Sequence, residues 1–496
     1  MHTPRLPHCL ITAALLPALL AGCVSAPKLG PKPAPRPLAA YAATQTLAAT
    51  PGASAPAADW WRAYADPQLT ALIEEGLASA PDVAIAVARL RQAEGYHQQA
   101  GAALLPRLDA KVLGQEAYIH DFPGGIAPNG WAGAGAEALQ LSFDIDLWGK
   151  NRAALRAARH EDEAAALDLA QARLTLSTAI ASSYADLARL YAERDVQAQA
   201  VQVKENTRRM VADRVANGLD TQAELKQAEA AVPTAQADLL ATDEQIALAR
   251  NTLAALLGKG PDRGLAIARP AVQVAARGLP ANASTDLIAR RPDVAAALAR
   301  VQADDEHIRE ARAGFYPALS ISGLAARPAL SWADFVKGGA FVGGVGPSVS
   351  LPIFHGGEIK GKYRTARGTY DEAVANYDKT LANAFHEVAD AAASQAALAG
   401  RLGAASQALT DAEGAYAVAR QRYEGGLSTY LNVLSAEEQV LSARRLHADL
   451  AARAFTLDVA LVRALGGGVE TTTAALSPAA PAPGAATAPS KDPHHG

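Results

Sequence analysis

Hydrophobic and polar positions divide the chain into long helical stretches and short alternating ones. Residues 151–217 contain no Gly and no Pro and are rich in Ala, Leu, Arg, Glu and Gln, which are good helix formers. This stretch predicts one helix of about 100 Å. After Gly218 the pattern resumes over residues 219–257, where Pro233 is expected to kink or break the helix. Residues 82–104 predict an earlier, shorter helix.

Four stretches between the helices alternate with period two, as strands do. They are residues 106–119, 134–147, 318–326 and 340–353. Each can supply the roughly 9–11 residues of a tilted transmembrane strand. Four strands cannot close a barrel, and open sheet edges are not tolerated in lipid, so a membrane barrel would need strands from several chains. Two soluble hairpins are the alternative.

The same plan occurs twice along the chain. PDVAIAVARL from Pro81 matches PDVAAALARV from Pro292, and RVANGLDT from Arg214 matches RYEGGLST from Arg422. Two copies of about 210 residues in the same order indicate an internal duplication, with a period much longer than that of solenoid repeats. The long helix of the second copy carries several glycines and is expected to bend more.

The first 23 residues resemble a bacterial lipoprotein signal. Arg5 precedes an apolar run, Leu10 to Leu20, that is too short to span a bilayer as a helix. The run ends in Leu-Ala-Gly-Cys, which resembles a lipobox and predicts cleavage before Cys23 and a covalent lipid on it. Val24 at the next position resembles outer-membrane sorting. Residues 27–58, rich in Pro and Ala, predict an extended tether.

Composition and charge exclude several classes of function. The 496 residues carry a formal charge of −4, so no basic excess indicates a nucleic-acid partner. The two cysteines, Cys9 and Cys23, both lie within the first 23 residues, which leaves no thiol chemistry for the rest of the chain.

Motifs for cofactor chemistry are incomplete. The sequence from Gly356 begins like a phosphate-binding loop, but Tyr363 replaces the Ser or Thr that ligates magnesium. His386-Glu387 begins a zinc motif, but Asp390 replaces the second His. The sequence therefore predicts no enzyme, no metal site and no cofactor besides the lipid on Cys23. Without energy-coupling machinery, any transport has to be driven by a partner.

Four motifs resemble the TolC-like outer-membrane efflux factors of the lipidated OprM/NodT type. They are WWRAYADPQL from Trp60, FDIDLWGKNR from Phe143, LPANASTDLIARRPDV from Leu279 and RYEGGLSTYLNVLSAEEQ from Arg422. The resemblance covers nearly all of the mature chain to about Gly468. It implies a mainly α fold with a membrane β-barrel: a homotrimer whose twelve-stranded barrel continues into a twelve-helix periplasmic barrel.

The resemblance also implies where function lies. The two helical turns would form the periplasmic tip, where an adaptor protein docks; the matching residues are Gly218, Leu219, Gly426 and Leu427. Residues of a periplasmic gate would be Arg422, Tyr423, Leu431, Asn432, Ser435, Asp220 and Glu224. Asn432 and Ser435 depart from the aspartates that family members often carry. Neutral rings at these positions are expected to weaken cation selectivity unless Asp220 and Glu224 substitute.

The predicted function is a passive exit duct in the outer membrane. With a periplasmic adaptor and an inner-membrane pump, expected to be proton-driven, it would export small toxic compounds. A duct for protein secretion, or a lipid-anchored periplasmic coiled-coil scaffold without a pore, are the alternatives. The predicted segments are a signal peptide (1–22), a lipidated tether (23–58), a first repeat (59–258), an equatorial connector (259–290), a second repeat (291–468) and a disordered tail (469–496).

Overall fold

The computed structural model describes most of the chain. The described residues are 26–41, 45–48, 50–51, 53–120, 130–274, 278–280, 291–329 and 341–468. The predicted signal peptide, Cys23 and the predicted C-terminal tail lie outside them.

The two repeats have matching elements. The first contains α2 (Pro67–Ser79), α3 (Pro81–Ala102), β1 (Arg107–Ile119), β2 (Gly130–Ile145), α4 (Lys150–Ala216) and α5 (Gln222–Leu256). After α6 (Asp262–Leu265), the second contains α8 (Pro292–Ala313), β3 (Ala318–Ala329), β4 (Val342–Ser350), α10 (Glu358–Glu424) and α11 (Tyr430–Ala464). The helices α3 and α8 have 22 residues each, α4 and α10 have 67 each, and α5 and α11 have 35 each. The duplication is therefore present in the fold.

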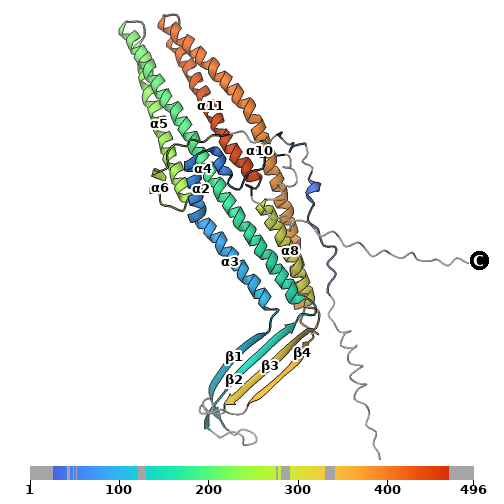
Figure 1. Ribbon diagram of the computed structural model, residues 1–496. Coiled ribbons are helices and arrows are strands. Elements are labelled where there is room, and N and C mark those ends of the chain that lie inside the picture. Colours follow the sequence, from blue (N-terminus) through green and yellow to red (C-terminus); the bar gives the residue numbers. More distant parts are fainter. Residues whose placement is uncertain are drawn as a thin grey trace, which may run out of the picture.

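The molecule is elongated, with the sheet at one end and two helical hairpins at the other (Figure 1). The long helices α4 and α10 run from the sheet to the tips, and α5 and α11 return from them. Helices α2 and α3 pack along α4, and α8 packs against both α4 and α10. At about 1.5 Å per residue, each long helix measures about 100 Å.

Three details of the helices bear on the sequence expectations. Pro233 does not break its helix, because α5 is continuous from Gln222 to Leu256. The proline removes one backbone donor, and packing of α5 along α4 stabilises the turns on either side. Helix α10 is also continuous through its glycines, and the stronger bend expected of it stays a prediction. Helix α2 was not expected; Asp66 caps it by accepting from the backbone N–H groups of Gln68 and Leu69.

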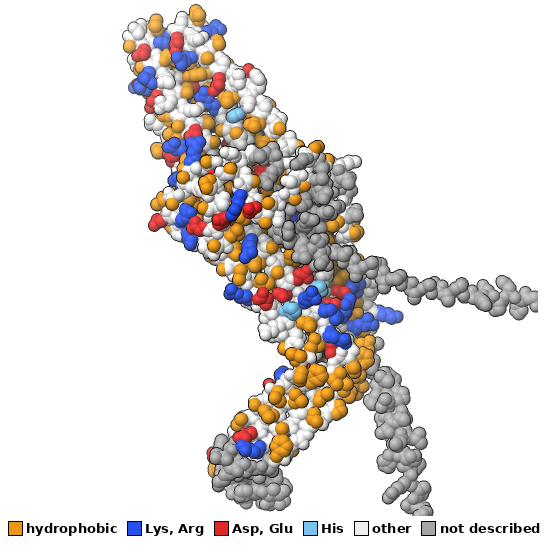
Figure 2. Space-filling view, in the orientation of Figure 1, with side chains coloured by type: hydrophobic (Ala, Val, Ile, Leu, Met, Phe, Trp, Pro, Cys, Tyr) orange, Lys and Arg blue, Asp and Glu red, His pale blue; other side chains and the backbone are white. Residues whose placement is uncertain are grey.

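The four strands form one antiparallel sheet in the order β1-β2-β3-β4. Arg107 pairs with Ser142, Ile145 with Leu319 and Ala318 with Ser350. Strands β1 and β4 are the two edges. Hydrophobic side chains gather over the sheet, while charged ones are spread over the helices (Figure 2). Among the described helices, none combines the length and the apolar character that a membrane span requires.

The predicted tether is docked where it is described. Tyr41 stacks on Phe385 of α10 with ring centroids 5.2 Å apart. The backbone N–H of Arg36 donates to Asp378 at 2.9 Å, and Tyr370 donates to the carbonyl of Pro33 at 2.9 Å. Part of the N-terminal segment therefore packs against α10.

Candidate functional site

The two helical turns at the tips share one backbone geometry. Gly218 and Gly426 have φ values of 73° and 74°, in the left-handed region that favours glycine. The N–H of Leu219 donates to the carbonyl of Arg214 at 2.9 Å, and that of Leu427 donates to the carbonyl of Arg422 at 2.7 Å. These bonds are the six-to-one closure of a Schellman motif, which ends both long helices in the same way.

A leucine follows each turn glycine and points into solvent. Leu219 is 64% exposed and Leu427 is 73% exposed. The turn itself needs only the glycines. Two large apolar side chains at the ends of the hairpins are therefore available to a partner.

A polar link joins the two hairpins just behind the turns. Arg214 Nε lies 2.9 Å from Asp220 Oδ2, and Arg214 Nη1 donates to the carbonyl of Tyr423 at 2.8 Å. The hydroxyl of Tyr423 donates to Asp220 Oδ2, and the Arg214 guanidinium lies 4.4 Å from the centre of the Tyr423 ring. Asp220 and Arg214 come from the first repeat and Tyr423 from the second.

Burial makes this link stable at neutral pH. Tyr423 is fully buried, and burial together with its hydrogen bond to Asp220 raises the pKa of its hydroxyl. The hydrogen bond to Asp220 also raises the pKa of Arg214. The phenol therefore remains a donor and the guanidinium remains charged. Behind them, Val211, Ala228, Tyr430 and Val433 form an apolar cluster.

A second polar contact joins α4 to α11 farther from the turns. Lys204 Nζ lies 2.7 Å from Glu437 Oε1 and 2.5 Å from Glu438 Oε1. Thr207 donates to Glu437 Oε2 at 2.6 Å. Glu437 is fully buried, and Lys204 is nearly so. Although burial alone would lower it, the pKa of Lys204 is raised by the two carboxylates.

The predicted gate residues occupy different surroundings. Asp220 and Tyr423 meet in the link, whereas Glu224 closes a capping box with Thr221 at the start of α5. The exposed residues of the set are Arg422, Leu431, Asn432 and Ser435. Arg422, Ser428 and Asn432 line a groove of about 480 Å³ between α10 and α11.

Sequence reasoning missed Arg214, Lys204 and Glu437. Arg214 could have been found, because the repeat alignment places it opposite Arg422. The pairing of Lys204 with Glu437 had no local signal, since it depends on how α4 lies against α11.

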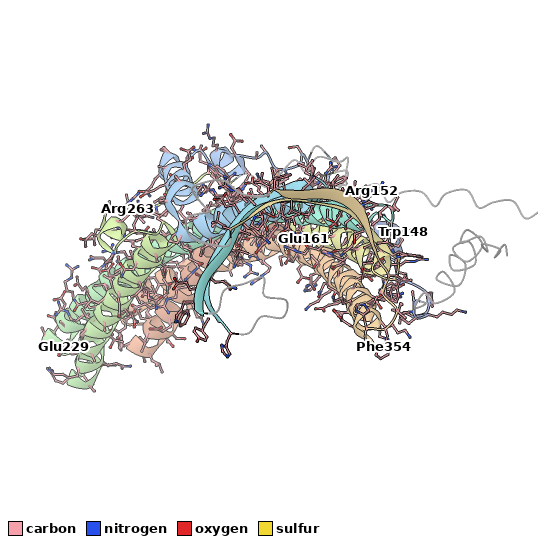
Figure 3. All side chains as sticks on the ribbon, turned by 90° about the horizontal axis from the view of Figure 1, so that it is seen from below. Trp148, Arg152, Glu161, Glu229, Arg263 and Phe354 are labelled. Carbon is pink, nitrogen blue, oxygen red and sulfur yellow. The ribbon has the colours of Figure 1, made fainter. Side chains whose placement is uncertain are left out.

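His307 on α8 is a further ionisable group, far from the tips. Its ring nitrogens lie 3.1 Å from Glu161 on α4 and 3.2 Å from Glu310. These two carboxylates raise the pKa of His307 to about 10. Figure 3 shows Glu161 on the curved helical layer, viewed from the sheet end. Within the described ranges, no group of three or more His, Cys, Asp or Glu side chains is arranged to hold a metal ion.

Comparison with known proteins explains the duplicated plan. The family described as outer membrane efflux protein matches residues 72–259 and 283–467, one match for each repeat. The chain belongs to this family. The fusaric acid resistance protein FusA of Burkholderia cepacia is 34% identical over 378 residues, covering 74% of this chain and 71% of FusA. The pyoverdine export outer membrane protein OpmQ of Pseudomonas aeruginosa is 29% identical over 357 residues, covering 69% and 73% of the two chains.

Solved structures show the same fold. VceC of Vibrio cholerae has 41% sequence identity and a TM-score of 0.79, and the match covers 84% of this chain and all of that one. The outer-membrane channel OprN has 24% identity and a TM-score of 0.79, with 90% and 99% covered. The predicted efflux family and its helical barrel with a β-barrel are confirmed. This member of the outer membrane efflux family is a channel protein of the outer membrane that serves as an exit duct for efflux.

Proposed function

We propose that the chain forms a lipid-anchored homotrimer that carries small toxic compounds from an inner-membrane pump across the outer membrane. The two open edges of the sheet support the trimer, because the outer edges of β1 and β4 have no partner strand within the described chain. An open edge in lipid leaves backbone groups without hydrogen bonds. Pairing β1 of one copy with β4 of the next removes both edges. The lipid on Cys23 would add an anchor beside the barrel.

The names of the relatives favour small compounds as cargo. FusA is named for resistance to fusaric acid and OpmQ for pyoverdine export. Both names support drug or metabolite efflux over a protein-secretion duct. The pump is expected to be proton-driven, with a periplasmic adaptor between pump and duct.

The exposed leucines are the proposed contacts of the adaptor. Leu219 and Leu427 stand at the ends of the two hairpins on turns of the same shape. A partner helix end can cover both leucines with apolar side chains of its own. Gly218 and Gly426 keep the turns compact enough to present them.

We propose that the polar link between the two hairpins holds the periplasmic gate closed. This link is the main structural observation behind the proposed function. Asp220 accepts from both Arg214 and Tyr423, so the tip of the second hairpin is held against the first. Movement of α10 and α11 away from α4 has to break these bonds. The exposed side chains of Leu431, Asn432 and Ser435 on α11 would line the opening.

A photo-crosslinker placed at Leu427 in the full-length, lipidated chain tests the docking role. The matched control places it at Leu240, which is 68% exposed but lies inside α5, away from the turn. Position 427 is expected to trap a periplasmic adaptor and position 240 is not. An adaptor that belongs to a proton-driven pump supports small-molecule efflux. An adaptor that belongs to an ATP-binding-cassette exporter would instead support secretion, and the absence of any product would refute docking at the tips.

A further inference from the structure

The charge at the tip of the second hairpin differs from what the family pattern implies. Asn432 and Ser435 are exposed and neutral, where the resemblance noted in the sequence implied acidic residues. Asp220 and Glu224, on the first hairpin, were the two carboxylates expected to substitute for them. Whether they can depends on what their oxygens already contact.

Both carboxylates are held by hydrogen bonds within the tips. Asp220 is engaged by the Arg214 guanidinium and by the Tyr423 hydroxyl, and its side chain is only 8% exposed. Glu224 Oε2 accepts from the backbone N–H of Thr221 at 2.8 Å within the capping box. Asp220 is therefore paired with a cation, whereas Glu224 keeps its charge and directs its carboxylate to the capping box.

On the second hairpin, the charged side chain beside Asn432 is an arginine. Arg422 is exposed and lines the same groove as Asn432. The rest of the groove wall consists of Ser428 and of small and apolar side chains of α10 between Gly414 and Ala419, so it contains no carboxylate. Within the described part of the chain, no ion pair involves Arg422. The neighbouring charges cancel, because Arg420 Nε lies 2.9 Å from Glu424 Oε1.

Comparison of the two repeats shows why Arg422 has no counter-ion among the described residues. In the first repeat the equivalent arginine, Arg214, pairs with Asp220. In the second repeat Ser428 stands at the position of Asp220, and Asn432 stands at that of Glu224. Among the described residues, the buried hydroxyl of Ser428 has no hydrogen-bond partner. The N-terminal end of α11 adds partial positive charge beside the groove.

We infer that Arg422 makes the periplasmic opening selective for anions, so that the duct favours compounds that carry a carboxylate or another negative charge at neutral pH. The inference rests on the proposed function, because it requires the second hairpin to line the opening. Threefold symmetry would repeat the arginine three times around it. Charges within a Debye length of about 10 Å at 0.1 M salt act on every permeating ion.

Reversal potentials across planar lipid bilayers test this with the full-length chain. In a potassium chloride gradient, the wild type is expected to pass chloride better than potassium. Arg422→Gln should lower the chloride-to-potassium permeability ratio by at least about threefold, and Arg422→Glu should invert it. The double variant Asn432→Asp/Ser435→Asp, which restores carboxylates, should also lower the ratio.

Two controls keep the outcomes distinct. Arg401→Gln removes an exposed arginine of the same helix, far from the groove, and should leave the ratio unchanged. Each variant is also made in a Tyr423→Phe chain, which loosens the link without changing charge, so that a closed tip does not hide the result. A conducting channel whose ratio does not depend on Arg422, or a wild type that prefers potassium, overturns the inference and leaves the exit duct intact. A chain that forms no pore in either background overturns the proposed function as well.

Discussion

The two repeats have helices of equal length, yet they lie in different surroundings. Helix α8 packs between α4 and α10, and nine of its 22 residues are buried. Its counterpart α3 packs along α4 at one side of the layer, and only Val83 and Ala86 are buried. The same helical plan therefore gives a central helix in one copy and an edge helix in the other. Position in the layer, and not local pattern, decides burial.

The tips of the two hairpins also differ, in the side-chain contacts that stabilise them. The first tip contains its own ion pair, Arg214 with Asp220, and its own capping box, Thr221 with Glu224. The second tip has neither, because Ser428 and Asn432 stand at the positions of the two acids. It is held through Tyr423, which reaches Asp220 of the first tip. The tip of the first hairpin is thus stabilised by its own contacts, whereas the tip of the second is stabilised by contacts with the first.

The largest effect on stability is expected at the buried ion pair that joins the two repeats. Lys204→Met leaves Glu437 buried without its cation and should destabilise the protein by about 3–5 kcal/mol. Thermal unfolding of the purified channel measures the loss. Glu437→Leu added to Lys204→Met should restore much of the stability, because the unpaired charge is gone. The control is Lys226→Met, which removes an exposed ion pair and should leave the unfolding temperature nearly unchanged. An unchanged unfolding temperature in Lys204→Met would show that the pair of Lys204 and Glu437 does not hold the repeats together.

A smaller difference is expected between the helix starts after the two turns. Thr221→Ala removes the cap of α5 and should cost about 1 kcal/mol. Thr429→Ala should cost much less, since Thr429 makes no side-chain cap bond to α11. Hydrogen exchange of the first turn of each helix measures both effects. Equal acceleration in the two variants would mean that the capping difference between the tips has no energetic weight.

The smallest effect concerns pH. The raised pKa of His307 means that its ion pairs with Glu161 and Glu310 stabilise the fold fully below its ordinary value of 6.5. This contribution is lost as pH rises toward about 10, because the folded state then gives up its extra proton. The unfolding temperature of the wild type should fall over this range more than that of His307→Gln. Parallel pH profiles for both proteins would contradict the assignment. The first repeat has Tyr96 at the equivalent position, so this pair of contacts belongs to the second repeat.

Much of the fold could be predicted because the local sequence determines the long helices. The Gly-free and Pro-free stretch 151–217 became α4, shifted by a single residue. The sequence predicted a kink or a break at Pro233, and α5 shows no break, because packing along α4 outweighs one lost hydrogen bond.

The candidate site was less predictable because it depends on contacts between repeats. The repeat alignment contained Arg214, but nothing in the local sequence showed that Asp220 would meet Tyr423. The buried Lys204 resembles any other lysine of a charged helix until α11 is placed against it.

The most direct test of the account is the single-channel conductance of Asp220→Ala. Loss of this carboxylate removes the acceptor that Arg214 and Tyr423 share, so the second hairpin keeps only the bond from Arg214 to the Tyr423 carbonyl and the apolar packing behind it. Asp213→Ala, which removes an exposed carboxylate of the same region, serves as the control. The account predicts a several-fold higher conductance for Asp220→Ala and a wild-type value for Asp213→Ala. Equal conductance of Asp220→Ala and the wild type would contradict the claim that this link closes the tip.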